Sequence, residues 1–105
     1  MVRPRKKCRV SVDPRVDYFK PRGVPLRHLA HITLEVDELE ALRLADHLGL
    51  NHEQAGNRMR VSRPTFGRIV ARARQKVADA LLHAKAIQIT QDPQRFGEPS
   101  NEERG

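Results

Sequence analysis

The sequence predicts a mainly α-helical domain with short flanking β-strands, on three observations. Proline or glycine interrupts the first thirty residues five times, so no long helix fits there. Three segments between residues 37 and 84 then carry apolar side chains at helical spacing, each after a helix-capping residue. Residues 86–90 alternate apolar and polar side chains, as a half-buried strand does. A chain of 105 residues suits one domain with a modest core.

Two short strands are expected before the helices. Residues 8–12 (Cys-Arg-Val-Ser-Val) alternate and are rich in β-branched side chains, and residues 32–34 (Ile-Thr-Leu) form a weaker candidate. The first helix is expected to begin at Asp37, because Glu40 stands three residues later as in a capping box. It is expected to end at Gly49.

Two further caps predict two more helices. Asn51, with Gln54 three residues later, opens a short helix to about Met59, and Ser62 opens the longest helix. An apolar stripe at helical spacing is expected to face the core from this long helix. It comprises Phe66, Ile69, Val70, Ala73, Val77, Ala80, Leu81 and Ala84.

A short helix, a turn of about four residues and a longer helix together describe a helix-turn-helix. The close crossing of its helices needs a small residue, which Ala55-Gly56 supplies, and Val61 is placed to fill the gap between them. Arg60 occupies the turn position that commonly holds a glycine with positive φ. A long side chain there costs about 1 kcal/mol, so either the turn differs or Arg60 is strained.

The composition shifts divide the chain into three parts. Residues 1–30 are expected to form a basic, proline-rich N-terminal arm with a short strand, and residues 31–91 the helix-turn-helix domain with its closing strand. Residues 92–105 are rich in Pro, Gly, Ser and Glu and are expected to be a disordered tail.

The charge distribution indicates a polyanionic partner. The net charge of +7 comes from two basic blocks, 1–27 and 58–85, that flank an acidic block over 28–57. With no Trp and only four aromatic residues (one Tyr and three Phe), stacking on unpaired bases is not expected. No apolar run is long enough to span a membrane and no secretory signal is evident, so a cytoplasmic, nucleoid-associated protein is expected.

The outward face of the long helix is suited to the major groove of double-stranded DNA. Donors near the helix start can read base edges, and arginines further along can contact phosphates. Arg63, Pro64, Thr65 and Arg68 are predicted to approach bases, Ser62 to cap the helix and contact phosphate, and Arg72 to bind phosphate. Sequence-independent attraction is expected from Arg58, Arg60, Arg3, Arg5, Lys6 and Lys7.

Several separated motifs resemble one family. The two longest motifs are Val36–Asp46 and Val61–Ile69. Three shorter ones are Arg3–Lys6, Tyr18–Gly23 and Ala86–Ile89, and all five follow one another along the chain in the order that the family shows. The chain resembles uncharacterised protein family 0251, small prokaryotic predicted DNA-binding proteins. The resemblance covers about the first ninety residues. It implies a sigma-factor region-four-like, winged-helix-like three-helix core, and a role in transcription regulation. Two positions depart from the family pattern: Arg60 replaces the turn glycine, and His83-Ala84 replaces an Asn-Gly helix stop.

Other interpretations of the same residues stay open. The basic stripe is also typical of a merely solvated helix face. The rival functions are an adaptor that docks on RNA polymerase through its acidic 35–53 face and a binder of structured RNA. A homodimer on paired half-sites, joined through strand edges, is a further expectation.

No enzyme, cofactor or metal is predicted, because no phosphate loop, nucleophile elbow or catalytic carboxylate pair is evident. His28 and His31 lack further ligands at suitable spacing, and a metal site across a dimer is the alternative. Cys8 lies among basic residues that favour a reactive thiolate, but a packed strand residue is the preferred interpretation.

Overall fold

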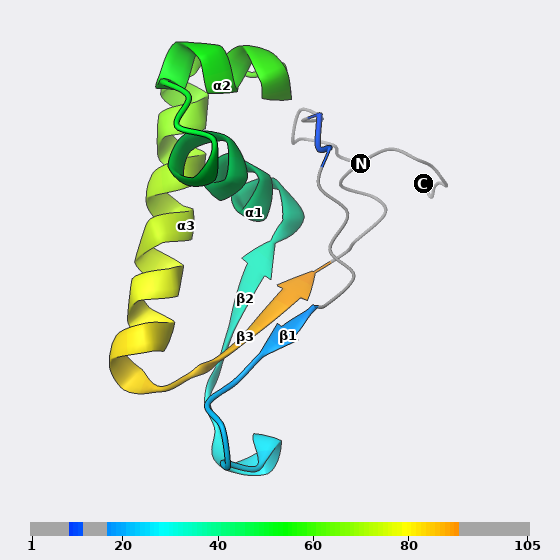
Figure 1. Cartoon of the computed structure of the whole chain (residues 1–105), viewed down its shortest axis with the longest axis vertical. Helices are drawn as coiled ribbons and strands as arrows, with labels where there is room; N and C mark the ends of the chain where they lie inside the picture. The colour runs from blue at the N-terminus through cyan, green and yellow to red at the C-terminus, as the bar shows by residue number, and fades with distance from the viewer. Residues whose placement is uncertain (1–8, 12–16, 91–105) are drawn as a thin grey trace, which may run out of the picture.

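The computed structural model describes residues 9–11 and 17–90, which form three α-helices and a three-stranded sheet (Figure 1). In chain order the elements are β1 (Tyr18–Phe19), a 3-10 turn (Leu26–His28), β2 (His31–Glu35), α1 (Val36–Leu42), a π-helical turn (Arg43–His47), α2 (His52–Met59), α3 (Arg63–His83) and β3 (Ala86–Thr90). The predicted class is confirmed: the domain is mainly α-helical, with a helix-turn-helix and short flanking strands. None of the described helices combines the length and apolar composition that a membrane span requires.

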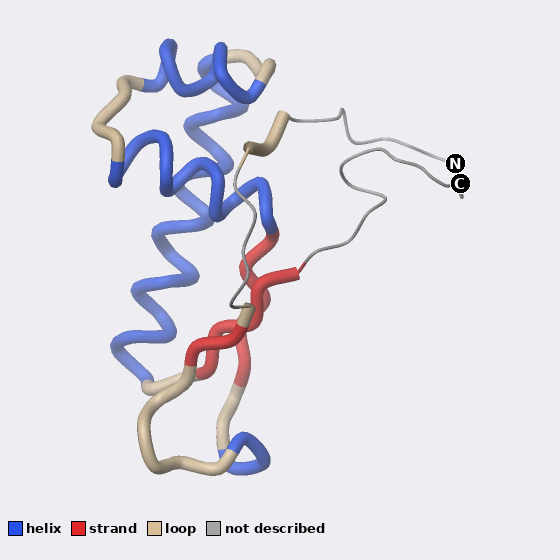
Figure 2. The backbone as a smooth tube through the Cα atoms, turned by 45° about the vertical axis from the view of Figure 1, so that its right-hand side comes forward, coloured by secondary structure: helices blue, strands red, loops and turns tan. Residues whose placement is uncertain are grey.

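The sheet pairs the strand that precedes the three α-helices with the strand that follows them. Its strand order is β1-β3-β2, so the closing strand β3 lies in the centre. It pairs antiparallel with β1, Tyr18 opposite Gln88, and parallel with β2, His31 opposite Ala86. All three α-helices therefore lie in the single connection between the parallel strands β2 and β3 (Figure 2).

Two apolar clusters share α3 as a common wall. The first fills the helix-turn-helix and comprises Ala41, Leu44, Ala55, Met59, Phe66, Ile69 and Val70. The second joins α3 to the sheet through Leu34, Val36, Ala73 and Ile89. Because successive turns of α3 contribute to both clusters, this helix holds the sheet and the two shorter helices in one unit.

Two of the three predicted caps are confirmed. Asn51 accepts a hydrogen bond from the Gln54 N–H (2.8 Å), and Gln54 reciprocates. Ser62 caps α3 as predicted. The start of the first helix was predicted one residue too late: α1 begins at Val36, because Glu35 is the capping residue and the Glu38 carboxylate accepts from its N–H (3.0 Å). Gly49 follows the π-helical turn at φ 77°, as expected of a helix stop.

The strand predictions have mixed outcomes. Residues 32–34 lie in β2 and residues 86–90 form β3, as predicted. Residues 9–11 form no strand; instead the Arg9 N–H donates to the Met59 carbonyl at the end of α2 (2.9 Å). The rest of the strand expected over 8–12, the arm up to residue 8 and the tail expected over 92–105 lie outside the described residues.

The apolar stripe of α3 ends earlier than predicted. Leu81 is 76% exposed and Ala84 is also exposed, because the last buried residue of the helix is Ala80. Ala84 then ends the helix in a left-handed conformation (φ 53°, ψ 46°). The exit into β3 thus keeps the backbone geometry that a glycine stop provides, although the residue is alanine.

Candidate nucleic-acid interface

The crossing of α2 and α3 depends on Gly56. A Cβ atom at this position would lie 3.0 Å from the Val61 carbonyl oxygen and 3.6 Å from the Phe66 Cβ. The first of these contacts is tighter than ordinary van der Waals packing, and its partner is backbone that cannot turn aside. The predicted small residue at the crossing is therefore confirmed, and Val61 packs partly buried against the same core.

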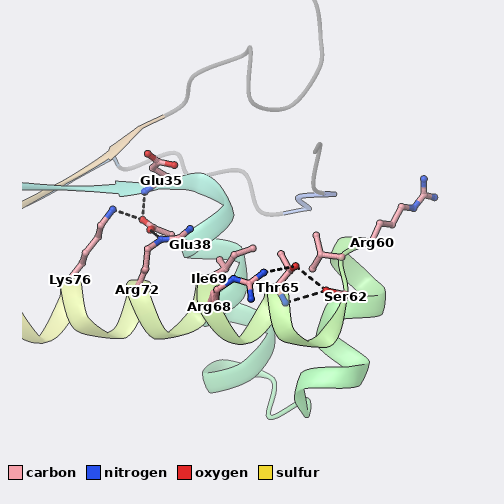
Figure 3. Close-up of a pocket in the computed structure, with 10 residues that line it drawn as sticks. Glu35, Glu38, Arg60, Ser62, Thr65, Arg68, Ile69, Arg72 and Lys76 are labelled. Carbon is pink, nitrogen blue, oxygen red and sulfur yellow. Dashed lines mark hydrogen bonds and ion pairs between the residues drawn. The ribbon is translucent and has the colours of Figure 1, made fainter. Parts of the chain in front are cut away.

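The turn is strained at the predicted residue. Arg60 adopts the left-handed conformation (φ 60°, ψ 42°), and its N–H donates to the Asn57 carbonyl (3.2 Å). A non-glycine residue there costs about 1 kcal/mol. The Arg60 side chain extends outward from the end of the groove described below, away from the other residues that line it (Figure 3).

A chain of polar contacts orders the first turns of α3. The Ser62 hydroxyl oxygen accepts from the Thr65 N–H (3.2 Å), and the hydroxyl donates to the Thr65 Oγ1 (2.9 Å). Arg68 donates to the same Thr65 oxygen (3.2 Å). These contacts lay the Arg68 guanidinium along the exposed face of the helix (Figure 3). Pro64 sits in the first turn, where its missing N–H costs nothing.

A groove of about 600 Å³ runs along this face. At one end its wall contains a buried carboxylate, Glu38, which is 1% exposed. Glu38 accepts from the Arg72 Nε (3.2 Å) and from the Lys76 Nζ (2.8 Å), and Lys76 also donates to the Thr33 carbonyl (2.8 Å). A single acidic side chain thus ties two cations of α3 to α1 and to β2 (Figure 3).

The cations at the start of α3 differ from those further along. Within the described part of the chain, Arg60, Arg63 and Arg68 form no ion pair with a carboxylate. Arg74, by contrast, donates twice to Asp46 (2.7 and 3.1 Å). These hydrogen bonds hold the pKa of the Asp46 carboxyl below its usual value and raise the pKa of the Arg74 guanidinium.

A second polar hollow, of about 520 Å³, lies beside α2 and contains Arg58. Its floor is the buried Glu40, which accepts two hydrogen bonds from Arg43 (2.7 and 3.0 Å) and one from the Ser11 N–H (3.1 Å). The hydrogen bonding to Glu40 raises the pKa of the Arg43 guanidinium. Arg9 lines the same hollow, so the described end of the N-terminal arm is held against α1 and α2.

The structure brings five of the twelve predicted site residues together in one groove. Ser62, Thr65, Arg68, Arg72 and Arg60 line the groove, while Arg63 and Pro64 are exposed in the first turn of α3. Arg58 lies in the separate hollow, and Arg3, Arg5, Lys6 and Lys7 are outside the described residues.

Sequence reasoning missed Lys76 and Glu38 in the groove. Lys76 follows Arg68 and Arg72 at four-residue intervals, a spacing that signals one helix face. Glu38 gave no such signal, because an acidic residue at a helix start ordinarily faces water. His28 and His31 lie in the 3-10 turn and in β2, and the described residues contain no group of three or more ligand-type side chains that could hold a metal ion.

The fold and this surface define a helix-turn-helix domain with an attached three-stranded sheet. The chain belongs to the UPF0251 family: the family model described as "Protein of unknown function DUF134" matches residues 1–94, and the similar chains given below are named UPF0251 proteins. This membership confirms the resemblance seen in the sequence motifs.

Similar chains occur in several bacteria. A UPF0251 protein of Desulfosudis oleivorans is 60% identical over 89 residues, which are 85% of this chain and 64% of that protein. A UPF0251 protein of Vibrio cholerae is 52% identical over 89 residues, 85% of this chain and 91% of that protein. The chain thus spans less than two thirds of the length of the Desulfosudis relative. No solved structure matches the chain.

Proposed function

We propose that the chain binds double-stranded DNA sequence-specifically and acts as a transcription regulator, with α3 in the major groove. The observation that carries this proposal is the ordered polar network at the start of α3. Ser62, Thr65 and Arg68 are linked by hydrogen bonds on one exposed face, with Arg63 beside them. Donors placed near the start of the second helix are what a helix-turn-helix uses to reach base edges.

The distribution of unpaired charge supports the same orientation. Arg60, Arg63 and Arg68 have no carboxylate partner among the described residues, so a phosphate would not have to displace one. The dipole at the start of α3 adds to this attraction. Both features concentrate positive potential at the turn and the first turns of the helix.

Arg72 has a more restricted role than a free arginine. Its Nε is engaged by Glu38, so only the terminal Nη groups remain to donate to a phosphate. The ion pair holds the side chain in one geometry before DNA arrives, which lowers the entropic cost of a contact. We therefore place Arg72 at the phosphate backbone, beyond the base-reading positions 63–68.

Selection of bound sequences from random duplex DNA tests the proposal. The wild-type chain is expected to enrich a defined motif. Arg68→Ala is expected to lower affinity for that motif about tenfold and to relax preference at one position, as the loss of a base contact does. Arg63→Ala is expected to act similarly.

Arg74→Ala is the matched control, because it removes the same charge from the same helix at a side chain held by Asp46. It should leave the motif unchanged. If Arg63→Ala and Arg68→Ala keep the full sequence preference, α3 does not read bases. Preference for RNA hairpins over every duplex DNA would favour the structured-RNA alternative. Co-purification with RNA polymerase after nuclease treatment, without DNA affinity, would favour the adaptor.

A further inference from the structure

The polar hollow beside α2, called the α2 hollow below, contains two arginines that no carboxylate of the described residues engages. Arg9 and Arg58 both line it and are exposed, and neither forms an ion pair within the described part of the chain. A third arginine of the lining, Arg43, is held by Glu40. The lining therefore carries three positive charges and one negative charge, a net charge of +2.

The carboxylate of the α2 hollow is already satisfied by groups of the chain. Glu40 accepts two hydrogen bonds from Arg43 and one from the Ser11 N–H. Hydrogen bonds of this kind, to an ionised acceptor, are the strong ones, so the negative charge of Glu40 is offset where it lies. The charge that remains for a ligand is that of Arg9 and Arg58, and it favours an anion.

The segment that carries Arg9 is fixed against the helices at three successive residues. The Arg9 N–H donates to the Met59 carbonyl (2.9 Å), and Val10 packs partly buried against the apolar cluster that joins α3 to the sheet. The Ser11 N–H then donates to Glu40 (3.1 Å). Figures 1 and 2 show this short segment beside the end of α2. Because its backbone is held in place, Arg9 loses less entropy on binding than an arginine in a free chain end.

Two amide side chains add neutral donors to the same lining. The Gln54 Oε1 accepts from the Asn51 N–H (3.0 Å), which leaves the Gln54 side-chain NH2 group to donate elsewhere. Asn57 is exposed and precedes Arg58 in the lining. Phosphate oxygens in protein–DNA complexes accept from arginine and from amide side chains alike, so this set of donors suits a phosphate group.

We propose that the α2 hollow binds a backbone phosphate of duplex DNA, with Arg9 and Arg58 as the residues that donate to it. Glu40 is a positioning residue, because it holds Ser11 and so keeps Arg9 at the hollow. The inference rests on the proposed function: when the second helix of a helix-turn-helix lies in the major groove, the first helix crosses the DNA backbone. Here α2 is that first helix, and after Met59 a short turn leads to Ser62 at the start of α3.

The main test measures the affinity of the full chain for the selected duplex over a range of salt concentrations. Arg9→Ala/Arg58→Ala is expected to bind about tenfold more weakly and to lower the slope of log affinity against log salt by about 2, because two phosphate contacts are lost. The enriched motif should stay the same, since a phosphate contact positions the protein without reading bases.

Arg22→Ala/Arg27→Ala is the matched control for charge. It also removes two exposed arginines, but from the loop between β1 and β2, at the opposite end of the molecule from α2 (Figure 1). Charges more than about 10 Å from the DNA are largely screened at 0.1 M salt, so this variant should change the affinity and the salt slope less. Circular dichroism and thermal unfolding check that both double variants fold.

A second pair of variants tests the positioning role of Glu40. Ser11→Pro removes the N–H that Glu40 accepts from, whereas Ser11→Ala keeps it. Ser11→Pro is expected to weaken binding, and adding Arg9→Ala to it should then have little further effect, because Arg9 is already displaced. Ser11→Ala should bind as the wild-type chain does. Equal binding by both Ser11 variants, or a full further loss from Arg9→Ala, would exclude this role.

Titration with inorganic phosphate, followed through the backbone amide signals in NMR spectra, separates the hollow from the proposed function. The signals of Arg9, Ser11 and Arg58 are expected to shift in the wild-type chain and to stay in place in Arg9→Ala/Arg58→Ala. If the wild-type chain binds no duplex DNA, the proposed function is refuted. Shifts that the double variant loses would then assign the hollow to a free phosphate group, and their absence would refute the hollow as well.

Two results on DNA overturn the proposal even when the wild-type chain binds its duplex. The first is an affinity and a salt slope that Arg9→Ala/Arg58→Ala leaves unchanged. The second is an equal loss in Arg22→Ala/Arg27→Ala, which would show that only the total charge of the chain matters.

Discussion

The two halves of α3 use their charged and apolar side chains in opposite ways. In the first half, Phe66, Ile69 and Val70 are buried in the helix-turn-helix, and Arg63 and Arg68 have no carboxylate partner among the described residues. From Arg72 onward, every cation of α3 is paired: Arg72 and Lys76 with Glu38, Arg74 with Asp46. The exposed leucines lie only in this second half.

This difference divides α3 into a first half whose arginines have no carboxylate partner among the described residues and a second half whose cations are held within the chain. The exposed pair of Arg74 with Asp46 contributes little to stability, but it holds the Arg74 guanidinium within the chain and makes it less available to a ligand. An arginine without a carboxylate partner binds phosphate or a base edge without first breaking a contact. A basic helix can therefore have a preferred end for DNA even though its positive charge runs along its whole length.

The largest expected effect concerns the apolar side chains of the two halves. Phe66→Ala should lower the free energy of unfolding by about 3–5 kcal/mol, because Phe66 is fully buried and its loss leaves a cavity. Leu81→Ala should change it by less than about 0.5 kcal/mol, because Leu81 is mostly exposed. Urea unfolding followed by circular dichroism measures both. Equal losses at the two positions would show that Leu81 packs within the monomer.

A smaller effect is expected from Glu38→Gln, which removes the charge that ties Arg72 and Lys76. The side chains of Arg72 and Lys76 are 48% and 32% exposed, so water compensates part of the loss, and we expect a destabilisation of about 1–3 kcal/mol. The released cations should also strengthen non-specific DNA binding and steepen its salt dependence. Asp46→Asn releases only one exposed arginine, so it should strengthen non-specific DNA binding and steepen its salt dependence less than Glu38→Gln does. A stable Glu38→Gln protein with an unchanged salt slope would contradict this account.

The smallest effect is expected on acidification. Arg74 lowers the folded-state pKa of Asp46, and Lys85 and His83 lower that of Asp79, below the unfolded value of about 3.9. The stabilisation from a lowered carboxyl pKa is fully present above the unfolded value and is lost as the pH falls through the folded value.

The Asp46 side chain is 45% exposed, so its pair with Arg74 should contribute less than about 1 kcal/mol. Thermal unfolding of the wild-type chain and Asp46→Asn should differ slightly at pH 6 and converge near pH 2. A difference that persists at low pH would show that the charge of Asp46 is not its source.

Local signals in the sequence predicted much of this fold. The side chains of Asn51 and Ser62 cap their helices by accepting from the N–H of the residue three positions later, so each cap is local in the sequence. The sequence left two alternatives for the turn, a different turn or a strained Arg60, and the structure shows the second, with Arg60 at φ 60°.

Features set by distant partners were not predictable. The two-residue strand β1 exists because β3 pairs with it, Tyr18 opposite Gln88. The start of α1, by contrast, is a local feature that was misassigned, because Glu38 reaches back only three residues to Glu35. The partner of Arg72 stands 34 residues away in the sequence. Leu81 continues the helical spacing of apolar residues in α3, so the sequence predicts that it is buried. It is exposed because the sheet and α1 do not extend far enough to cover it.

The parallel pairing of β2 with β3 also has a consequence for folding. His31 pairs with Ala86, although the two residues are 55 positions apart in the sequence. Closing so long a loop is entropically costly unless structure within it has already shortened the distance. The capped helices α2 and α3, which are adjacent in sequence, are therefore expected to form first, with β3 joining β2 last. On a ribosome, where β3 emerges after every other described element, the chain would carry a folded helical hairpin before its sheet can close.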